Sequence, residues 1–159
     1  MPQQLRTAPS NTLPLSTRPV FFAANELLLE LIGIAQGYAK TDLESLLIIL
    51  CVSNATMRPF MLNSSGQPIT TSELVDETLR GSISRRTVAT ETGLPRETVR
   101  RKVDELTDAG LLIVDDRGRL RSTPLLGDPD LQRAIDTMDG AVRRYQTRLS
   151  QFHVRLRGV

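Results

Sequence analysis

The pattern of apolar and polar positions predicts helices over most of the chain. Residues 21–36 are apolar on most sides, which is typical of a helix that is largely buried. The residues before them, 1–20, contain four of the nine prolines and show no hydrophobic periodicity. That composition predicts a disordered or extended arm, so the folded part of the chain is expected to begin near residue 21.

A second helix is predicted over residues 41–54. Thr41 and Glu44, three residues apart, form a capping box at its start. Apolar positions at helical spacing then predict a core-facing stripe of Leu43, Leu46, Leu47, Leu50 and Cys51. Pro59 and the loop sequence at 63–68 indicate that the helix ends before them.

A further capping box, Thr70 and Glu73, predicts a short helix that reaches about residue 80. We therefore divide the chain into an N-terminal helical region at 21–69, a second domain at 70–124 and a C-terminal segment at 125–159. The second domain contains most of the motifs that bear on function.

The sequence of this domain predicts a helix, a turn and another helix. Ser84 can cap a short helix over residues 85–92, and Gly93 supplies the backbone freedom that a tight turn between helices requires. Ala89, four residues before this glycine, suits the crossing of two helices, where there is room for little more than a methyl group. The second helix is predicted at 95–109, opened by a proline and followed by a glycine that stops it.

The helix at 95–109 is amphipathic. Its inner stripe consists of Val99, Val103 and Leu106. Its outer face carries Arg96, Glu97, Arg100, Arg101 and Asp104. Residues 111–114 and 119–122 then predict two short strands joined by a turn, which is a hairpin with a basic tip.

Helix, turn, amphipathic helix and hairpin together resemble the winged helix-turn-helix domain of bacterial transcription regulators of the IclR, GntR and MarR type. The resemblance covers about 45 residues and rests on Ala89, Gly93, Leu94, Val99, Val103, Leu106, Gly110, Leu111 and a turn-forming Asp-Arg-Gly at compatible offsets. It implies a mainly α fold, with a three-helix core plus a β-hairpin wing, extra N-terminal helices and a long C-terminal helix.

The C-terminal segment has a heptad pattern. Asp128 and Pro129 suit the N-cap and first position of a helix. Apolar residues then recur at alternating spacings of four and three: Leu131, Ile135, Met138, Val142, Tyr145, Leu149, Phe152 and Leu156. Such a seam is typical of a long helix that packs lengthwise against another helix.

The partner of this seam is either a second copy of the chain, which would make it a dimer interface, or the helix at 21–36, and the two packings are compatible. Regulators of the MarR type, which this layout resembles, build their dimer from N- and C-terminal helices outside the DNA-binding core. They usually place two helices after the wing, whereas one is predicted here, so the subfamily stays open.

Composition excludes several classes of function. One cysteine, Cys51, and one histidine, His153, do not make up a usual zinc ligand set, and no cofactor is implied. The sequence also contains none of three motifs that would indicate an enzyme: paired carboxylates in a structured motif, a phosphate-binding glycine loop or an activated nucleophile. The longest uncharged stretch of the central region, 46–57, is interrupted by polar residues, and the first twenty residues lack the apolar run of a secretory signal. We therefore expect a soluble, cytoplasmic protein with no membrane partner.

The charge is distributed unevenly. The net charge of +2 divides into −3 over residues 1–79, +3 over 80–121 and +2 over 122–159. Eighteen of the twenty cations are arginine, whose planar fork suits phosphate and guanine. High-GC coding produces the same preference, so composition alone leaves an anionic partner open.

The resemblance places the helix at 95–109 in the major groove of double-stranded DNA. Its early outer residues would read base edges: Arg96, Glu97, Thr98, Arg100 and Arg101. Contacts with phosphates are expected from Arg85, Arg86 and Thr87, at the start of the preceding helix. Arg117 and Arg119, in the wing at 115–121, would lie along the backbone or in the minor groove, although Asp115 and Asp116 disfavour close approach to phosphate. The function implied is that of a sequence-specific transcriptional regulator, expected to act as a homodimer because a single module rarely reaches operator-level affinity.

Other interpretations stay open. The arginines at 95–109 also suit a solvated face offset by acids, and a winged helix can bind protein or RNA within a larger assembly instead. A small-molecule effector is a further option. Its pocket would lie between the helical region and the second domain, near Phe21, Phe22, Met57, Phe60 and Met61, although such residues are more often core.

Overall fold

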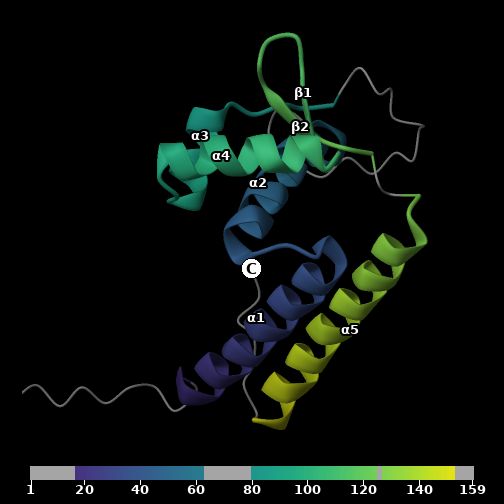
Figure 1. The fold of residues 1–159 in the computed structure, drawn as a ribbon. Coiled ribbons are helices and arrows are strands. Elements are labelled where there is room, and N and C mark those ends of the chain that lie inside the picture. Colours follow the sequence, from purple (N-terminus) through teal and green to yellow (C-terminus); the bar gives the residue numbers. More distant parts are fainter. Residues whose placement is uncertain (1–16, 63–79, 125–126, 153–159) are drawn as a thin grey trace, which may run out of the picture. The chain divides into compact units, whose positions relative to one another are not determined.

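The computed structural model describes residues 17–62, 80–124 and 127–152, and this part of the chain is mainly helical, as predicted (Figure 1). Its elements in chain order are α1 (Thr17–Ala39), α2 (Leu43–Met61), α3 (Arg85–Thr92), α4 (Arg96–Asp108), β1 (Leu112–Val114), β2 (Leu120–Ser122) and α5 (Pro129–Gln151). β1 and β2 form a small antiparallel sheet.

The described residues fall into two compact units. Residues 17–34 and 135–152 form one, which we call the paired-helix unit. The described residues between 35 and 134 form the other, the central unit. The central unit includes α2, which the sequence analysis grouped with α1. The short helix predicted from Thr70 and Glu73 lies outside the described residues, as do the first sixteen residues of the predicted arm.

Helix α1 is longer than predicted at both ends. It begins at Thr17, so the prediction of an arm is wrong for residues 17–20. Pro19 is tolerated there because the N–H groups of a first helical turn have no partner within the helix. The helix continues through Gly37 to Ala39 and ends at Lys40, whose φ of 49° is left-handed.

Helix α2 differs from its prediction at both ends. Asp42, not Thr41, is its N-cap, and the Asp42 carboxylate accepts a hydrogen bond of 3.0 Å from Ser45 N. The helix continues through Pro59 to Met61, so the expectation that it ends near residue 54 is wrong. A contact distant in sequence accompanies this extension, because Gly81 N donates to Thr56 O at 3.0 Å.

The hydrophobic core of the central unit joins α2, α3, α4 and the hairpin. Its buried members are Ile48, Val52, Ile83, Val88, Ala89, Val99, Val103, Leu106, Leu112 and Leu120. The inner stripe predicted for α4 is therefore confirmed. The stripe predicted for α2 is only partly right: Leu46 is buried and Cys51 is partly buried, but Leu43, Leu47 and Leu50 are exposed. Apolar residues occupy two faces of α2, and the sequence did not indicate which face meets the core.

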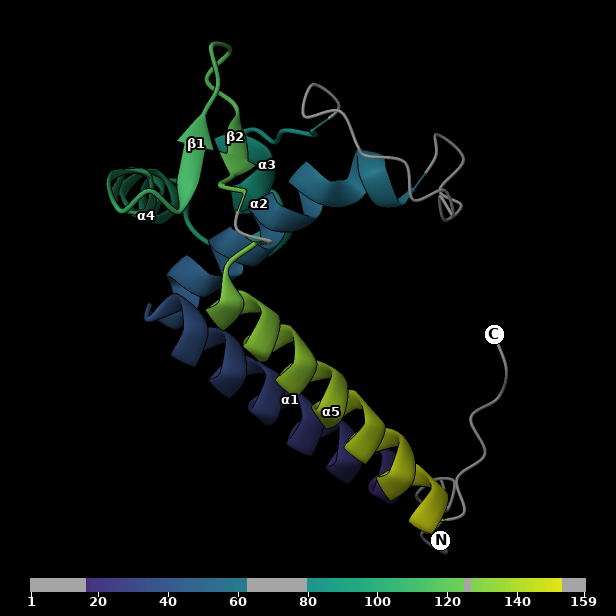
Figure 2. The same ribbon diagram turned by 90° about the vertical axis from the view of Figure 1, so that its right-hand side faces the viewer.

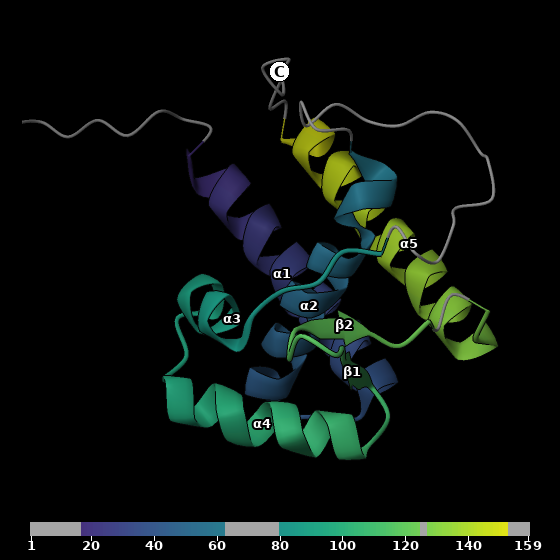
Figure 3. The same ribbon diagram turned by 90° about the horizontal axis from the view of Figure 1, so that it is seen from above.

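The predicted helix, turn and helix are present. Ser84 caps α3 by accepting a hydrogen bond of 3.1 Å from Thr87 N, and Gly93 adopts a φ of 72° in the turn. Pro95 precedes the first residue of α4 instead of occupying that position. Gly110 has a φ of 72° just after the C-terminus of α4, as expected of a helix stop. Figure 3 shows α3 and α4 beside the β1–β2 hairpin.

The hairpin is also close to its prediction. Leu112 pairs with Ser122 and Val114 with Leu120. In the turn, the Asp115 carboxylate accepts hydrogen bonds from the backbone N–H groups of Arg117 and Arg119 at 3.0 and 2.9 Å. An isolated bridge pairs Leu120 with Ile83, the residue just before the cap of α3, so the hairpin is tied to the start of that helix.

In the paired-helix unit, α1 and α5 lie side by side and antiparallel (Figure 2). Arg148 of α5 forms an ion pair with Glu26 at 3.1 Å, and Arg144 forms one with Glu30. The prediction that α1 is largely buried is wrong in this structure. Ala23 is buried beside α5, but Phe21, Phe22, Leu28 and Leu29 are exposed, and the other large aliphatic side chains of α1 are only partly buried.

In the described part of the chain, α1 and α2 are each long and apolar enough, by length and composition alone, to cross a membrane. One face of α2 belongs to the core of the central unit. A core helix of a soluble protein passes the same test, so the finding is weak support for a membrane protein.

Candidate functional site

The outer face predicted for α4 is exposed in the structure. Two of its arginines form ion pairs within the helix: Arg100 with Glu97 at 2.5 Å and Arg101 with Glu105 at 2.7 Å. The pairing lowers the pKa of the Glu97 carboxyl and raises the pKa of Arg100. All four side chains remain more than half exposed, so a partner can reach them.

The charges of α4 are segregated along its axis. Its cations all lie in the first two turns: Arg96, Arg100, Arg101 and Lys102. Three of its four acids lie in the last two turns: Asp104, Glu105 and Asp108. The helix dipole favours the opposite arrangement, with acids near the N-terminus and cations near the C-terminus. The order of the Arg101–Glu105 pair is likewise the less favourable one for a helix. Glu97 in the first turn and its pair with Arg100 follow the favourable order, so helix stability explains the placement of this acid but not that of the cations.

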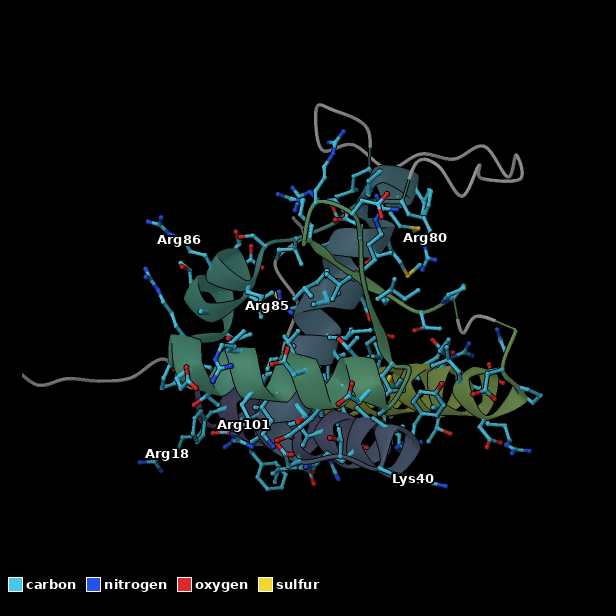
Figure 4. All side chains as sticks on the ribbon, turned by 45° about the horizontal axis from the view of Figure 1, so that its top comes forward. Arg18, Lys40, Arg80, Arg85, Arg86 and Arg101 are labelled. Carbon is cyan, nitrogen blue, oxygen red and sulfur yellow. The ribbon has the colours of Figure 1, made fainter. Side chains whose placement is uncertain are left out.

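Three predicted contact residues have guanidinium groups without a polar partner among the described residues: Arg86, Arg96 and Arg117. Arg86 lies in the first turn of α3 and points away from the central unit (Figure 4). Arg96 is the first residue of α4, and Arg117 lies in the hairpin turn. None of the three guanidinium groups therefore has to break an ion pair within the described residues to bind a partner.

Two other predicted phosphate contacts are engaged within the protein. Arg85 reaches Asp104 of α4 at 3.4 Å, and the Nε atom of Arg85 is buried without a hydrogen-bond partner. Arg119 donates to Ser82, from Nε to the hydroxyl at 2.8 Å and from Nη2 to the carbonyl at 2.6 Å. Thr87 is exposed and Thr98 is partly buried. Arg85 and Arg119 thus connect elements of the central unit.

The carboxylate of Asp115 stabilises the hairpin turn, which reduces its repulsion of an approaching phosphate. The backbone N–H of Arg119, and then that of Arg117, lower the pKa of its carboxyl. Its other oxygen lies 3.6 Å from the guanidinium of Arg121. Part of the negative charge that we expected at the wing is therefore neutralised locally.

Lys102 is a site residue that the sequence analysis missed. It is 8% exposed, and its Nζ lies 2.6 Å from Oδ2 of Asp42 and 3.6 Å from Glu105. The hydrogen bond from Lys102, followed by that from Ser45 N, holds the pKa of the Asp42 carboxyl well below its usual range. A sequence signal existed, because Lys102 follows Val99 by three positions and so lies at the edge of the buried stripe. Its partner, sixty residues away, left no such signal.

The residues of the seam predicted on α5 differ in burial. Of its members, Leu149 is buried, and Leu131, Met138 and Tyr145 are partly buried. Ile135, Val142 and Phe152 are exposed, at about two fifths of their surface each. Ala134 and Ala141, which the heptad pattern did not include, are buried.

A larger apolar surface lies on α1, where we had expected a buried helix. Leu29 is 72% exposed and Phe21 is 67% exposed, and Phe22 and Leu28 are exposed by more than half. We call these four side chains the outer face of α1. Glu26 and Glu30 bind arginines of α5, and one of these, Arg148, also lies 6.0 Å from the centre of the Phe22 ring, so Phe22 is at the edge of this face nearest to α5.

An open groove of about 580 Å³ lies between α1 and α5. Its charged lining consists of Glu26, Glu30, Arg143, Arg144 and Arg148. None of the five residues suggested for an effector pocket lines it. The small-molecule effector therefore stays a prediction from the sequence.

The described residues contain no group of three or more histidines, cysteines or acids that could hold a metal ion. The thiol of Cys51 donates to Oε2 of Glu91 at 3.2 Å. Burial, and then this hydrogen bond, raise the pKa of Cys51 to about 12, which disfavours the nucleophilic thiolate at neutral pH.

Comparisons with known proteins show similarity of fold alone. No protein-family model matches the chain, and no curated protein matches it. Among solved structures, the chain is similar to a protein with unknown function from Listeria innocua Clip11262. The two are 19% identical, with a TM-score of 0.51, over 86% of this chain and 84% of that one.

Proposed function

We propose that this protein is a winged helix-turn-helix transcription regulator that binds double-stranded DNA as a homodimer in the cytoplasm. In this proposal α2, α3 and α4 are the three-helix core and the β1–β2 hairpin is the wing. The order of these elements, the left-handed glycine between α3 and α4 and the bridge from Ile83 to the hairpin support it.

The segregated charge of α4 carries the proposal. A cluster of cations at the start of this helix opposes the helix dipole, but suits an anionic partner that approaches that end. The major groove of DNA admits a helix, and its base edges offer guanine acceptors to Arg96, Arg100 and Arg101. Glu97 can accept from cytosine N4, and the Thr98 methyl can touch thymine.

The contacts with phosphate are graded by the partners that each arginine already has. Arg86 and Arg117 have no polar partner among the described residues, so we assign them the strongest phosphate contacts. The hydroxyl of Thr87 lies 2.8 Å from that of Ser84, so we assign it a weaker contact. Arg85 and Arg119 are already bound to Asp104 and Ser82. We therefore expect weaker contributions from these two.

The homodimer is proposed on the exposed apolar side chains of the paired-helix unit. The outer face of α1, with Ile135, Val142 and Phe152 of α5, would contribute on the order of 600 Å² of apolar surface per protomer. A standard interface buries about 800 Å² per partner. A second copy would thus cover both the outer face of α1 and the exposed part of the predicted seam.

The proposal is tested with Arg100→Ala combined with Arg101→Ala. Both side chains are exposed, so the variant should fold normally, and it should lose sequence preference because each base contact contributes about 1–3 kcal/mol of discrimination. Binding to a selected and a random duplex is measured by fluorescence anisotropy. The matched control is Arg133→Ala with Arg143→Ala, which removes two arginines that also form ion pairs within a helix.

The control should bind both duplexes as the wild type does. Unchanged discrimination in the Arg100/Arg101 variant would reject α4 as the recognition helix. A wild-type protein that binds RNA or another protein but no DNA duplex would favour the interaction module instead.

A further inference from the structure

The ion pair between Lys102 and Asp42 is the shortest polar link between α4 and another element among the described residues. Lys102 is the only buried cation there, and its ammonium group faces the N-terminus of α2. Because the Nζ atom is held at 2.6 Å from Asp42, it is not available to a phosphate. One of the four cations at the start of α4 therefore has a different task from the other three.

The carboxylate of Asp42 accepts hydrogen bonds from residues of two helices, α2 and α4. Oδ1 accepts from Ser45 N and so caps α2, while Oδ2 accepts from Lys102 and from the Ser45 hydroxyl at 3.0 Å. Two residues before it, Lys40 is left-handed and ends α1. The carboxylate is therefore fixed to the first turn of α2, and any cation bound to it is fixed there as well.

A second ion pair holds the other side of α4. Arg85 of α3 reaches Asp104, which follows Lys102 by two positions. Residues two apart on a helix point about 200° from each other, so the two pairs grip α4 on nearly opposite flanks. Val99, Val103 and Leu106 bury the inner face between them, but apolar contacts are non-directional and permit some rolling of a helix. Two ion pairs on opposite flanks restrict that rotation.

We propose that Asp42 is a positioning residue that, through Lys102, fixes the rotation of α4 about its own axis and so decides which side chains of α4 face the bases. This inference rests on the proposed function, because it concerns the specificity of the same helix. It assigns the sequence preference partly to a residue outside the helix-turn-helix segment, in the turn between α1 and α2.

The test is a double-mutant cycle of Asp42→Asn and Lys102→Met. Asparagine is as good an N-cap as aspartate, so Asp42→Asn removes the charge and keeps an oxygen for Ser45 N. Methionine keeps most of the volume of the lysine stem. The measured quantity is the affinity for a selected duplex divided by the affinity for a random duplex, at several salt concentrations.

Each single variant should lower this ratio about tenfold, and the double variant should be no worse than the poorer single, since both remove the same link. Affinity for the random duplex should stay within about twofold, and the slope of log K against log salt should not change. A slope reduced by about one in Lys102→Met would mean that Lys102 binds a phosphate itself, and this would overturn the proposal. Additive effects of the two variants would overturn it as well.

A readout without DNA separates this inference from the proposed function. In Asp42→Asn, backbone amides of α4 should exchange with deuterium faster, while those of β1 and β2 keep their protection. Unchanged protection in α4 contradicts the positioning role whether or not the protein binds DNA. A wild-type protein that binds no duplex contradicts the proposed function, and the exchange result still decides the role of Asp42.

Discussion

Gly81 shows how a single residue can control the docking of two distant segments. A Cβ atom at this position would lie 2.1 Å from the carbonyl oxygen of Ala55 and 3.1 Å from the ring of Pro59. The backbone N–H of Gly81 donates to Thr56 O at 3.0 Å, so the chain entering α3 lies directly on the last turns of α2. No side chain larger than hydrogen fits without moving one of these segments.

We therefore predict that Gly81→Ala destabilises the protein by about 2 kcal/mol, within the range for an added methyl group in a packed site. The measurement is urea denaturation followed by circular dichroism. Gly37→Ala is the matched control, because a Cβ there meets no atom within 4 Å and alanine favours the helix by up to about 1 kcal/mol. Equal stability of the Gly81 variant and the wild type would show that the close contact does not exist in solution.

For single residues, the sequence predicted the features that depend on near neighbours. The cap at Ser84, the left-handed Gly93 and Gly110, and the buried Val99 and Val103 all follow from patterns a few residues long. Features that depend on distant residues were missed or misassigned. The pair of Lys102 and Asp42 spans sixty residues, so no local pattern could reveal it.

Among the helices, α4 gives the main support for DNA binding, because its cations lie near its N-terminus. Because Arg96 is the first residue of the helix and has no polar partner among the described residues, its charge opposes the dipole without compensation. We predict that Arg96→Glu raises the free energy of unfolding by about 0.5 kcal/mol and weakens DNA binding. Arg96→Gln, which removes the charge without reversing it, should give intermediate values for both.

Denaturation and duplex titration of the same samples measure the two effects together. A variant that is less stable than the wild type would contradict the dipole argument. A variant that is more stable but binds DNA equally well would separate stability from function, and would remove the reason for assigning the cations of α4 to a nucleic acid.

The helices also show where pattern-based boundaries fail. The sequence placed the end of α2 before Pro59, because proline removes a helical hydrogen bond. The helix nevertheless continues to Met61, with the chain at Gly81 packed against its last turns. Tertiary packing thus overrode a local stop signal, whereas the stop at Gly110, which no distant segment opposes, was predicted correctly.

For the whole molecule, the sequence showed that the paired-helix unit is rich in apolar residues but did not show which surface covers them. A helix that is apolar on most sides predicts burial, but the pattern does not say whether the covering surface belongs to the same chain. In the described residues, α5 leaves most of the outer face of α1 uncovered, and only Phe22 has an arginine of α5 beside it. The mainly α fold was thus predictable from one sequence, and the surroundings of α1 were not.

We predict that the wild type sediments as a dimer at micromolar concentration, and that Leu28→Glu combined with Leu29→Glu makes it a monomer. Polar substitution of the exposed Val142 should act in the same direction. Tyr145 lines the groove beside α1, so polar substitution there should also disturb the pairing of α1 with α5. Analytical ultracentrifugation measures the mass, with Met61→Glu, an exposed apolar residue of the central unit, as the control. A monomeric wild type would reject the interface.

The most direct test of DNA recognition by this protein is the selection of bound duplexes from a random pool by the wild type. We predict enrichment of a twofold-symmetric sequence with half-sites about one helical turn apart. The affinity for that sequence should fall steeply between about 50 and 200 mM salt. A pool that stays random after repeated rounds, with no duplex retained at the lower salt concentration, would contradict the assignment of this protein to DNA.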